Sequence, residues 1–338
     1  MANASSRDST IRRRLVTIPA ILLAGIIVIP AMLILAPLSI VFDLVRGKLR
    51  MPTIRVALFG LFYLYWDIFA VLAGFVLWIA SGFGLLLGRR TFVQMHRWLQ
   101  VSWANTLLAA MRALVNLHLE IDGTECIAGG PVVVFSRHTS MVDTLLPAHI
   151  LSTYGGLDLR YVLKAELVMD PALDVIAHRI PNHFVDRSGT DTAAELAKIG
   201  ELAAGMDDNE SLTIFPEGSR YTEAKRARAL ERLAESSPAL LERAEALTLT
   251  MPPRPGGVLT VLRNAPDTDV LIIAHSGLEG LAGPKDLWKA APFRRPVLIK
   301  VWRIPAAEIP AEDDDRIDWI YSVWAEVNAW VVERSDRS

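Results

Sequence analysis

The stretch that decides the fold is residues 131–143, which read PVVVFSRHTSMVD. Its first part, Val132–Phe135, is a run of β-branched and aromatic residues that predicts a buried strand. Its second part becomes polar at once and places a histidine and an aspartate close together in the chain. In a parallel sheet, ligands bind outside the carboxyl ends of the strands. This stretch therefore predicts both a central strand and a candidate site.

Runs of the same kind recur after residue 115, with helical patterns between several of them. The predicted strands are His118–Ile121, Val132–Phe135, Leu159–Leu163, His183–Val185, Leu212–Phe215, Val270–Ala274 and Val297–Val301. Helices are predicted at Thr144–Leu151 and Thr192–Met206. This alternation predicts the α/β class, with a largely parallel central sheet flanked by helices.

Two further segments complete the predicted α/β domain. Tyr221–Thr250 is charged with mixed signs and favours a solvated helical hairpin, which Pro238 is expected to divide. Arg316–Arg334 places apolar residues at helical spacing and predicts a final amphipathic helix packed on the sheet. Anchoring of this last helix at a membrane interface by its tryptophans is the alternative.

The composition divides the chain into two unlike parts. Of the 338 residues, 52% are apolar, and the mean hydropathy is +0.32. Residues 1–100 hold 11 Lys and Arg against 3 Asp and Glu, whereas the rest is acidic and the whole chain carries −2. The single cysteine excludes a disulfide scaffold. The basic residues flank apolar runs and form no aromatic-studded polar patch, so nucleic acid is not expected as a partner.

The basic part contains two long apolar runs. Leu15–Phe42 has 28 residues without a charge, and Val56–Gly88 has 33 residues with one charge. At about 1.5 Å per residue, either helix could exceed a hydrocarbon core of about 30 Å. A cleaved signal peptide after Arg12–Arg14 is the alternative, but its apolar region would be about half as long. We therefore expect a membrane-embedded helical region at residues 1–100 and an α/β domain at residues 101–338.

Basic clusters stand before, between and after the two runs, at Arg12–Arg14, residues 46–55 and residues 89–97. Two full spans would place the middle cluster outside, against the bias that keeps basic loops on the cytoplasmic side. Pro30 lies in the middle of the first run, where it can break a helix. We therefore favour helices that enter the cytoplasmic leaflet and return to the same side, rather than two helices that each cross the membrane. The globular domain is then expected on the cytoplasmic face of the plasma (inner) membrane.

The polar part of residues 131–143 holds the first candidate chemistry. His138 and Asp143 can meet if the chain turns from loop into helix between them. The carboxylate could then hold one imidazole nitrogen and leave the other to take a proton from a substrate hydroxyl. The alternative is structural, with the histidine capping a helix and the aspartate on its first turn.

Two other loops follow predicted strands and carry arginines. Residues 215–220 read FPEGSR, where Glu217 offers a carboxylate and Arg220 can grip a phosphate with paired N–H groups. Residues 184–187 end another strand and offer Arg187 as a second phosphate ligand. The alternatives are a turn with a surface ion pair in the first loop and a salt bridge to a neighbouring aspartate in the second.

Together these residues resemble the motifs of the 1-acyl-sn-glycerol-3-phosphate acyltransferase family of glycerolipid acyltransferases. The family's His-x4-Asp motif is matched by His138 and Asp143. Its Phe-Pro-Glu-Gly-(Thr/Ser)-Arg motif is matched by residues 215–220 at every position. Its Gly-x-x-Phe-x-x-Arg motif is matched at Phe184 and Arg187. Motif order and separations agree, so the resemblance covers roughly residues 115–305.

The sequence also departs from the family pattern. Pro181 stands in place of the usual glycine in the second motif, and Arg137 stands where asparagine often precedes the histidine. The fourth motif, an apolar strand that usually contains proline, corresponds loosely to Leu271–His275, which has none. These departures leave acyltransferase activity expected, but they bear on which acceptor molecule the protein uses.

The resemblance implies transfer of a fatty acyl group from acyl-CoA or acyl-ACP to the hydroxyl of lysophosphatidic acid, which gives phosphatidic acid. It implies His138 as general base, with Asp143 orienting it, and Glu217 aligning the acceptor or the loop. The substrate-binding residues that it implies are Phe184, Arg187, Glu217, Gly218, Ser219 and Arg220.

No metal and no cofactor besides the acyl thioester co-substrate are expected, and membrane lipids are the expected partners. One alternative is a different acceptor, such as a lysophospholipid, glycerol 3-phosphate or a glycolipid. The other is a non-catalytic lipid-binding protein in the membrane.

Overall fold

A computed structural model describes residues 2–186 and 192–335, which pack as two compact units. The predicted division after residue 100 falls inside helix α3 (Arg89–Val115), which packs against α2 (Pro52–Ala80). That packing keeps all of α3 with the N-terminal helices. The helical unit comprises Met1–Leu117, Lys164–Asn182 and Trp288–Arg294, and the sheet unit comprises His118–Leu163, His183–Leu287 and Arg295–Ser338.

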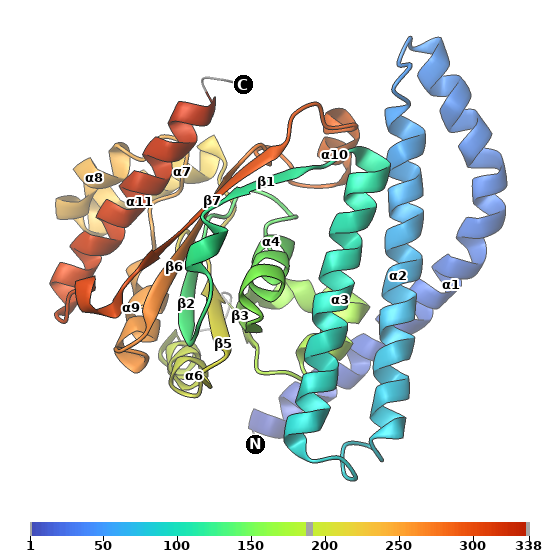
Figure 1. Ribbon diagram of the computed structural model, residues 1–338. Helices are drawn as coiled ribbons and strands as arrows, with labels where there is room; N and C mark the ends of the chain where they lie inside the picture. Colours follow the sequence, from blue (N-terminus) through green and yellow to red (C-terminus); the bar gives the residue numbers. More distant parts are fainter. Residues whose placement is uncertain (1, 187–191, 336–338) are drawn as a thin grey trace. The chain divides into compact units, whose positions relative to one another are not determined.

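A seven-stranded sheet forms the centre of the sheet unit (Figure 1). Its strands are β1 (Leu119–Asp122), β2 (Val132–Ser136), β3 (Asp158–Lys164), β4 (His183–Val185), β5 (Glu210–Ile214), β6 (Asp269–Ser276) and β7 (Val297–Ile304). Their order in the sheet is β1-β7-β6-β2-β5-β3-β4. β2 pairs parallel with both β5 and β6, whereas β6 and β7 pair antiparallel. Each predicted strand is confirmed, as is the α/β class with a largely parallel sheet.

Helices fill most connections between these strands. They are η1 (Thr124–Cys126), α4 (Leu145–Ile150), the π-helical turn η2 (Leu151–Gly155), α6 (Thr192–Ala204), α7 (Glu223–Ser236), η4 (Pro238–Leu240), α8 (Leu241–Glu245), α9 (Pro255–Asn264), α10 (Pro284–Ala290), η5 (Ala306–Glu308) and α11 (Asp313–Ser335). α4 and α6 confirm the two helices predicted between strands. The predicted charged hairpin is α7, η4 and α8, and Pro238 divides it as expected.

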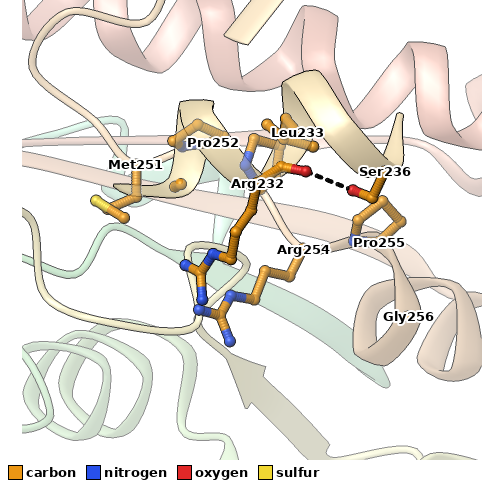
Figure 2. Close-up of a pocket in the computed structure, with 10 residues that line it drawn as sticks. Arg232, Leu233, Ser236, Met251, Pro252, Arg254, Pro255 and Gly256 are labelled. Atoms are coloured by element: carbon orange, nitrogen blue, oxygen red, sulfur yellow. Dashed lines mark hydrogen bonds between the residues drawn. The ribbon is translucent and has the colours of Figure 1, made fainter. Parts of the chain in front are cut away.

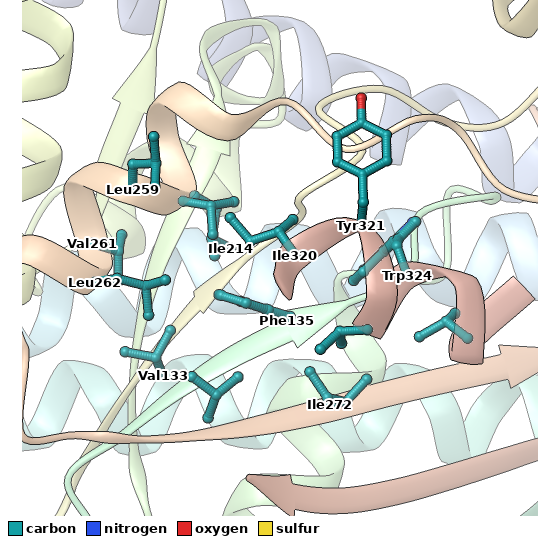
Figure 3. Packing of buried hydrophobic residues seen from close by; sticks show 14 of the residues in the cluster. Val133, Phe135, Ile214, Leu259, Val261, Leu262, Ile272, Ile320, Tyr321 and Trp324 are labelled. Atoms are coloured by element: carbon teal, nitrogen blue, oxygen red, sulfur yellow. The ribbon is translucent and has the colours of Figure 1, made fainter. Parts of the chain in front are cut away.

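One face of the sheet packs against α6, α9 and α11 in a continuous apolar core (Figure 3). Val133 and Phe135 of β2 belong to this core, and Trp324 of α11 is fully buried in it. α11 is therefore the amphipathic final helix that the sequence predicts. The alternate residues Val132 and Val134 are also fully buried, so β2 is covered on both faces, as parallel strands usually are.

The helical unit is built from α1 (Ala2–Val45), α2 and α3, with η3 (Ala165–Met169) and α5 (Pro171–Ala177). α2 packs against α1, α3 and α5. α1 runs without interruption through three prolines, so the break predicted at Pro30 is wrong. A proline in a helix removes one backbone donor, and α1 responds by curving instead of ending (Figure 1).

The apolar side chains of α1 lie largely on its surface. Ile26 and Leu33 are 72% and 76% exposed. Residues Ser9–Val45 and Pro52–Ala80 are long and apolar enough to cross a membrane. A continuous apolar surface of this size is rare on soluble proteins, and it suggests a membrane location.

The first basic cluster makes contacts within the protein. Arg13 Nη2 donates to Asp174 Oδ1 at 2.7 Å, and Arg14 Nε donates to Asp174 Oδ2 at 2.9 Å. Burial alone would raise the pKa of Asp174, but hydrogen bonds from His178, Arg13 and Arg14 hold it well below its usual range. Two of the three arginines that the sequence assigns to lipid headgroups are therefore paired with a buried carboxylate of α5.

Candidate active site

The central strands β2, β5 and β6 run in the same direction, and the loops that follow them meet at one edge of the sheet. The N–H of Arg137 donates to the carbonyl of Ile273 at 3.0 Å, which ties the loop after β2 to β6. The N–H of Tyr221 donates to the carbonyl of His138 at 2.9 Å, which ties it to the loop after β5. The sheet thus brings two of the predicted motifs, residues 136–143 and 215–220, to one place.

His138 and Asp143 form a hydrogen-bonded pair. Nδ1 of His138 lies 3.0 Å from Oδ2 of Asp143. The His138 side chain is 21% exposed, and within the described part of the chain no hydrogen bond reaches its Nε2. α4 begins only at Leu145, so the alternative of a helix cap does not fit. One imidazole nitrogen is held by a carboxylate and the other is accessible, which is the arrangement of a general base.

Asp143 is fully buried among hydrogen-bond donors. Its Oδ2 accepts from the N–H groups of Thr139 and Ser140, the second at 2.7 Å, and its Oδ1 accepts from the Ser140 hydroxyl. Burial alone would raise the pKa of Asp143, but His275, His138 and Ser140 outweigh it and hold the pKa below its ordinary value. The carboxylate is therefore ionised at neutral pH and can stabilise a protonated His138.

Glu217 stabilises the loop after β5 through hydrogen bonds in the protein interior. Its side chain is fully buried, with Oε1 accepting from the N–H of His138 at 2.8 Å and Oε2 from the N–H of Met251 at 2.9 Å. Burial raises the pKa of Glu217 to about 8, against the opposing effects of Arg137 and these two N–H groups. A surface ion pair is excluded. Of the two roles predicted for Glu217, this geometry favours alignment of the loop.

The other residues of this loop are more accessible. Gly218 has a φ of +66°, and a Cβ there would lie 2.8 Å from Cδ of Arg254, so the position requires glycine. Ser219 and Arg220 are half-buried. Arg220 Nη1 donates to the carbonyl of Ala282 at 3.0 Å, and its other N–H groups make no hydrogen bond to the described residues.

The second motif is described only in part. Phe184 is a half-buried residue of β4. Its neighbour His183 contacts Glu195 of α6, with 2.9 Å between Nε2 and Oε2. Arg187 lies outside the described residues, so its assignment as a phosphate ligand stays a prediction.

His275 and Arg137 are buried beside the His138–Asp143 pair. Neither was assigned to the site from the sequence. Nε2 of His275, at the end of β6, lies 3.1 Å from the carbonyl of Arg137 and 3.4 Å from Oδ1 of Asp143. Arg137 donates to the carbonyl of Leu249 at 2.8 Å and pairs with Glu279. Burial lowers the pKa of His275, against the opposing charge of Asp143.

Replacing His275 by leucine should lower kcat/KM by about tenfold to a hundredfold, because the hydrogen bond to the Arg137 carbonyl and the polar contact with the Asp143 carboxylate are both lost. Asp143 would then act more fully on His138, so the acid limb of the kcat/KM profile should move to higher pH. His275→Gln keeps an N–H donor and should recover part of both effects. Reduced activity with an unmoved acid limb would assign His275 to packing alone.

Comparisons with known proteins find similarity to acyltransferases. A family model described as Acyltransferase matches residues 118–273. Over 242 residues the chain is 22% identical to lysocardiolipin acyltransferase 1 of Mus musculus. The aligned region covers 68% of this chain and 62% of that protein, so the chain spans less than two thirds of this relative. The chain is also similar to the crystal structure of the 1-acyl-sn-glycerophosphate (LPA) acyltransferase PlsC of Thermotoga maritima, with a TM-score of 0.49 and 14% sequence identity. The superposed region covers 81% of this chain and 97% of that chain.

The match to the family model extends from the residue before β1 into β6. It therefore includes the His138–Asp143 pair and the whole of residues 215–220. The match identifies residues 118–273 as an acyltransferase domain, and the similarity to lysocardiolipin acyltransferase 1 supports a relationship to the glycerolipid acyltransferases.

Proposed function

We propose that this acyltransferase moves a fatty acyl group from an acyl thioester to the free hydroxyl of lysophosphatidic acid, giving phosphatidic acid in phospholipid biosynthesis. The thioester is carried by coenzyme A or by acyl carrier protein. The observation that carries the proposal is the 3.0 Å contact between Nδ1 of His138 and the buried Asp143, beside residues 215–220. A protein that only binds lipid has no use for a base of this kind.

In the proposed reaction, Nε2 of His138 takes the proton of the acceptor hydroxyl while the hydroxyl oxygen attacks the thioester carbonyl carbon. Asp143 keeps the proton on Nδ1 and stabilises the imidazolium. When the tetrahedral intermediate collapses, the C–S bond breaks and the departing thiolate takes the proton back from His138. General-base action supplies about 10²–10⁴-fold of the rate, and the rest comes from positioning.

A phosphate on the acceptor is supported by the arginines of the second and third motifs. Arg220 keeps N–H groups that the described residues do not use, and a guanidinium matches the oxygens of a phosphate in fork geometry. Arg187 is proposed as its companion. Phe184, Gly218 and Ser219 are proposed to border the acceptor, and Glu217 to hold the loop that presents them.

We place the reaction at the cytoplasmic face of the plasma (inner) membrane. The acceptor and product are lipids, and the exposed apolar helix α1 offers a surface that fits a bilayer. Four exposed basic residues from the clusters at 46–55 and 89–97, Arg46, Arg50, Arg89 and Arg90, flank α2 and suit anionic headgroups, whereas Arg97 is buried. The re-entrant arrangement of α1 and α2 stays a prediction.

A second candidate acceptor is a lysophospholipid with a larger headgroup. The similarity to a lysocardiolipin acyltransferase favours it. The chemistry at His138 would be unchanged, because both acceptors offer a glycerol hydroxyl near a phosphate. The two candidates differ only in what the site admits around that phosphate.

An acyl-transfer assay with the purified full chain distinguishes these acceptors. We expect kcat/KM for lysophosphatidic acid to exceed that for monoacylglycerol by at least about tenfold, because an acceptor without phosphate leaves cationic groups unpaired. Each acceptor is tested with acyl-CoA and with acyl-ACP. A preference for lysocardiolipin would select the second candidate. Equal use of monoacylglycerol would contradict a phosphate site, and transfer to none would leave a non-catalytic lipid-binding protein.

A further inference from the structure

A pocket of 220 Å³ lies between α7 and the segment that leads into α9 (Figure 2). Leu233 of α7 and the run Met251–Pro253 give it apolar walls. Of the residues that line it, only Arg232 and Arg254 are charged. Pockets that enclose a drug-sized molecule measure about 300–1,000 Å³. This one therefore suits one charged group of a larger ligand.

The two arginines of the pocket extend side by side, with their guanidinium groups next to each other (Figure 2). Within the described residues, neither forms a salt bridge or a side-chain hydrogen bond. By contrast, Arg243 and Arg263 on the same unit pair with Asp318 and Asp313. Both side chains are exposed, and partial desolvation followed by the charge of Arg232 lowers the pKa of Arg254. Two like charges held together without a carboxylate favour the binding of an anion between them.

The pocket is joined to the candidate active site by residues 215–220. The N–H of Arg254 donates to the carbonyl of Pro216 at 2.8 Å, and its side chain packs on Gly218. Met251, in the pocket wall, donates its N–H to the same Glu217 carboxylate that holds the N–H of His138. One short loop therefore connects the paired arginines to the general base. An anion bound here would contact the segment that also holds the backbone of His138.

We propose that Arg232 and Arg254 bind a phosphate group of one of the two substrates, at a subsite separate from Arg220. The inference rests on the proposed acyl transfer, since both substrates of that reaction carry phosphate. Guanidinium groups present planar forks of N–H donors, and two of them can hold a phosphate from two sides. The phosphate comes from the acyl-thioester carrier or from the acceptor, and kinetics separate these sources.

The experiment uses the full chain with Arg232→Gln, Arg254→Gln and the double variant. KM is measured separately for acyl-CoA and for lysophosphatidic acid. We expect one of the two KM values to rise by about tenfold or more in each single variant, with kcat little changed, because a charge-assisted contact is lost. Arg254→Lys keeps the charge but loses the fork, so it should fall between wild type and Arg254→Gln.

The matched control is Arg228→Gln. Arg228 lies on the same helix and is exposed, with its Nε donating to the carbonyl of Ala224 at 3.1 Å, and it does not line the pocket. Its replacement removes one positive charge from α7 and should leave both KM values unchanged. Circular dichroism and thermal unfolding establish that each variant is folded.

A higher KM for acyl-CoA alone assigns the subsite to the carrier, and a higher KM for lysophosphatidic acid alone assigns it to the acceptor. Unchanged KM values in the folded double variant would overturn the inference. Calorimetry of pyrophosphate binding requires no catalytic turnover. It therefore tests the phosphate subsite independently of the proposed acyl transfer. An inactive wild-type chain whose pyrophosphate binding is lost in the double variant would contradict the proposed function and support the subsite.

Discussion

Replacing His138 by alanine will lower kcat for acyl transfer by at least about a hundredfold, because the acceptor hydroxyl then has no base to take its proton. His275 cannot take over this role, since it is fully buried and its Nε2 faces Arg137 and Asp143. KM for both substrates should change little, because no proposed binding contact is removed. Steady-state kinetics with lysophosphatidic acid and acyl-CoA in lipid vesicles measure this.

The control for this loss is His118→Ala. His118 is exposed and stands just before β1, away from the loops that hold His138. Its replacement should leave kcat unchanged. Vesicle flotation of His138→Ala should match that of wild type, because the apolar helices α1 and α2 are intact. Unchanged turnover in folded His138→Ala would remove His138 from its assigned role.

The sheet could be predicted from the sequence because its strands are short, apolar and separated by helical patterns. β4 and β2 illustrate this, since the first was predicted with its observed ends and the second ends one residue later than predicted. The motif loops were located for the same reason, as each follows a recognisable strand. What periodicity does not encode is the order of the strands. The approach of His275 to Asp143 follows from the pairing of β6 with β2, which no local pattern specifies.

The course of α1 and the role of Glu217 could not be predicted from local sequence patterns. α1 continues through Pro30 although proline disfavours a helix interior, and local propensity alone does not decide whether such a helix bends or breaks. Glu217 was predicted as a residue that aligns either acceptor or loop. The choice depends on two N–H groups, those of His138 and Met251, from segments that are distant in the chain. Contacts of this kind become visible only in three dimensions.

Replacing Asp143 by asparagine should reduce kcat/KM by about 10²–10⁴-fold, a range typical of a base that has lost its orienting carboxylate. An amide can no longer fix the proton on Nδ1 of His138 or stabilise the imidazolium. The acid limb of the kcat/KM profile should also move to lower pH, since a neighbouring negative charge that favours the charged imidazole is gone. A pH series of kcat/KM between about 5 and 9 measures both effects.

The direction of that pH shift distinguishes a role in proton transfer from a loss of stability. His275→Leu should move the acid limb upward and Asp143→Asn downward, although both remove polar contacts from one buried cluster. The matched control is Glu210→Gln, which removes a buried carboxylate paired with Arg160 at the amino end of β5. It should lower the melting temperature and leave the profile in place. A general loss of folded protein lowers activity at every pH, so opposite shifts require that both side chains act through His138.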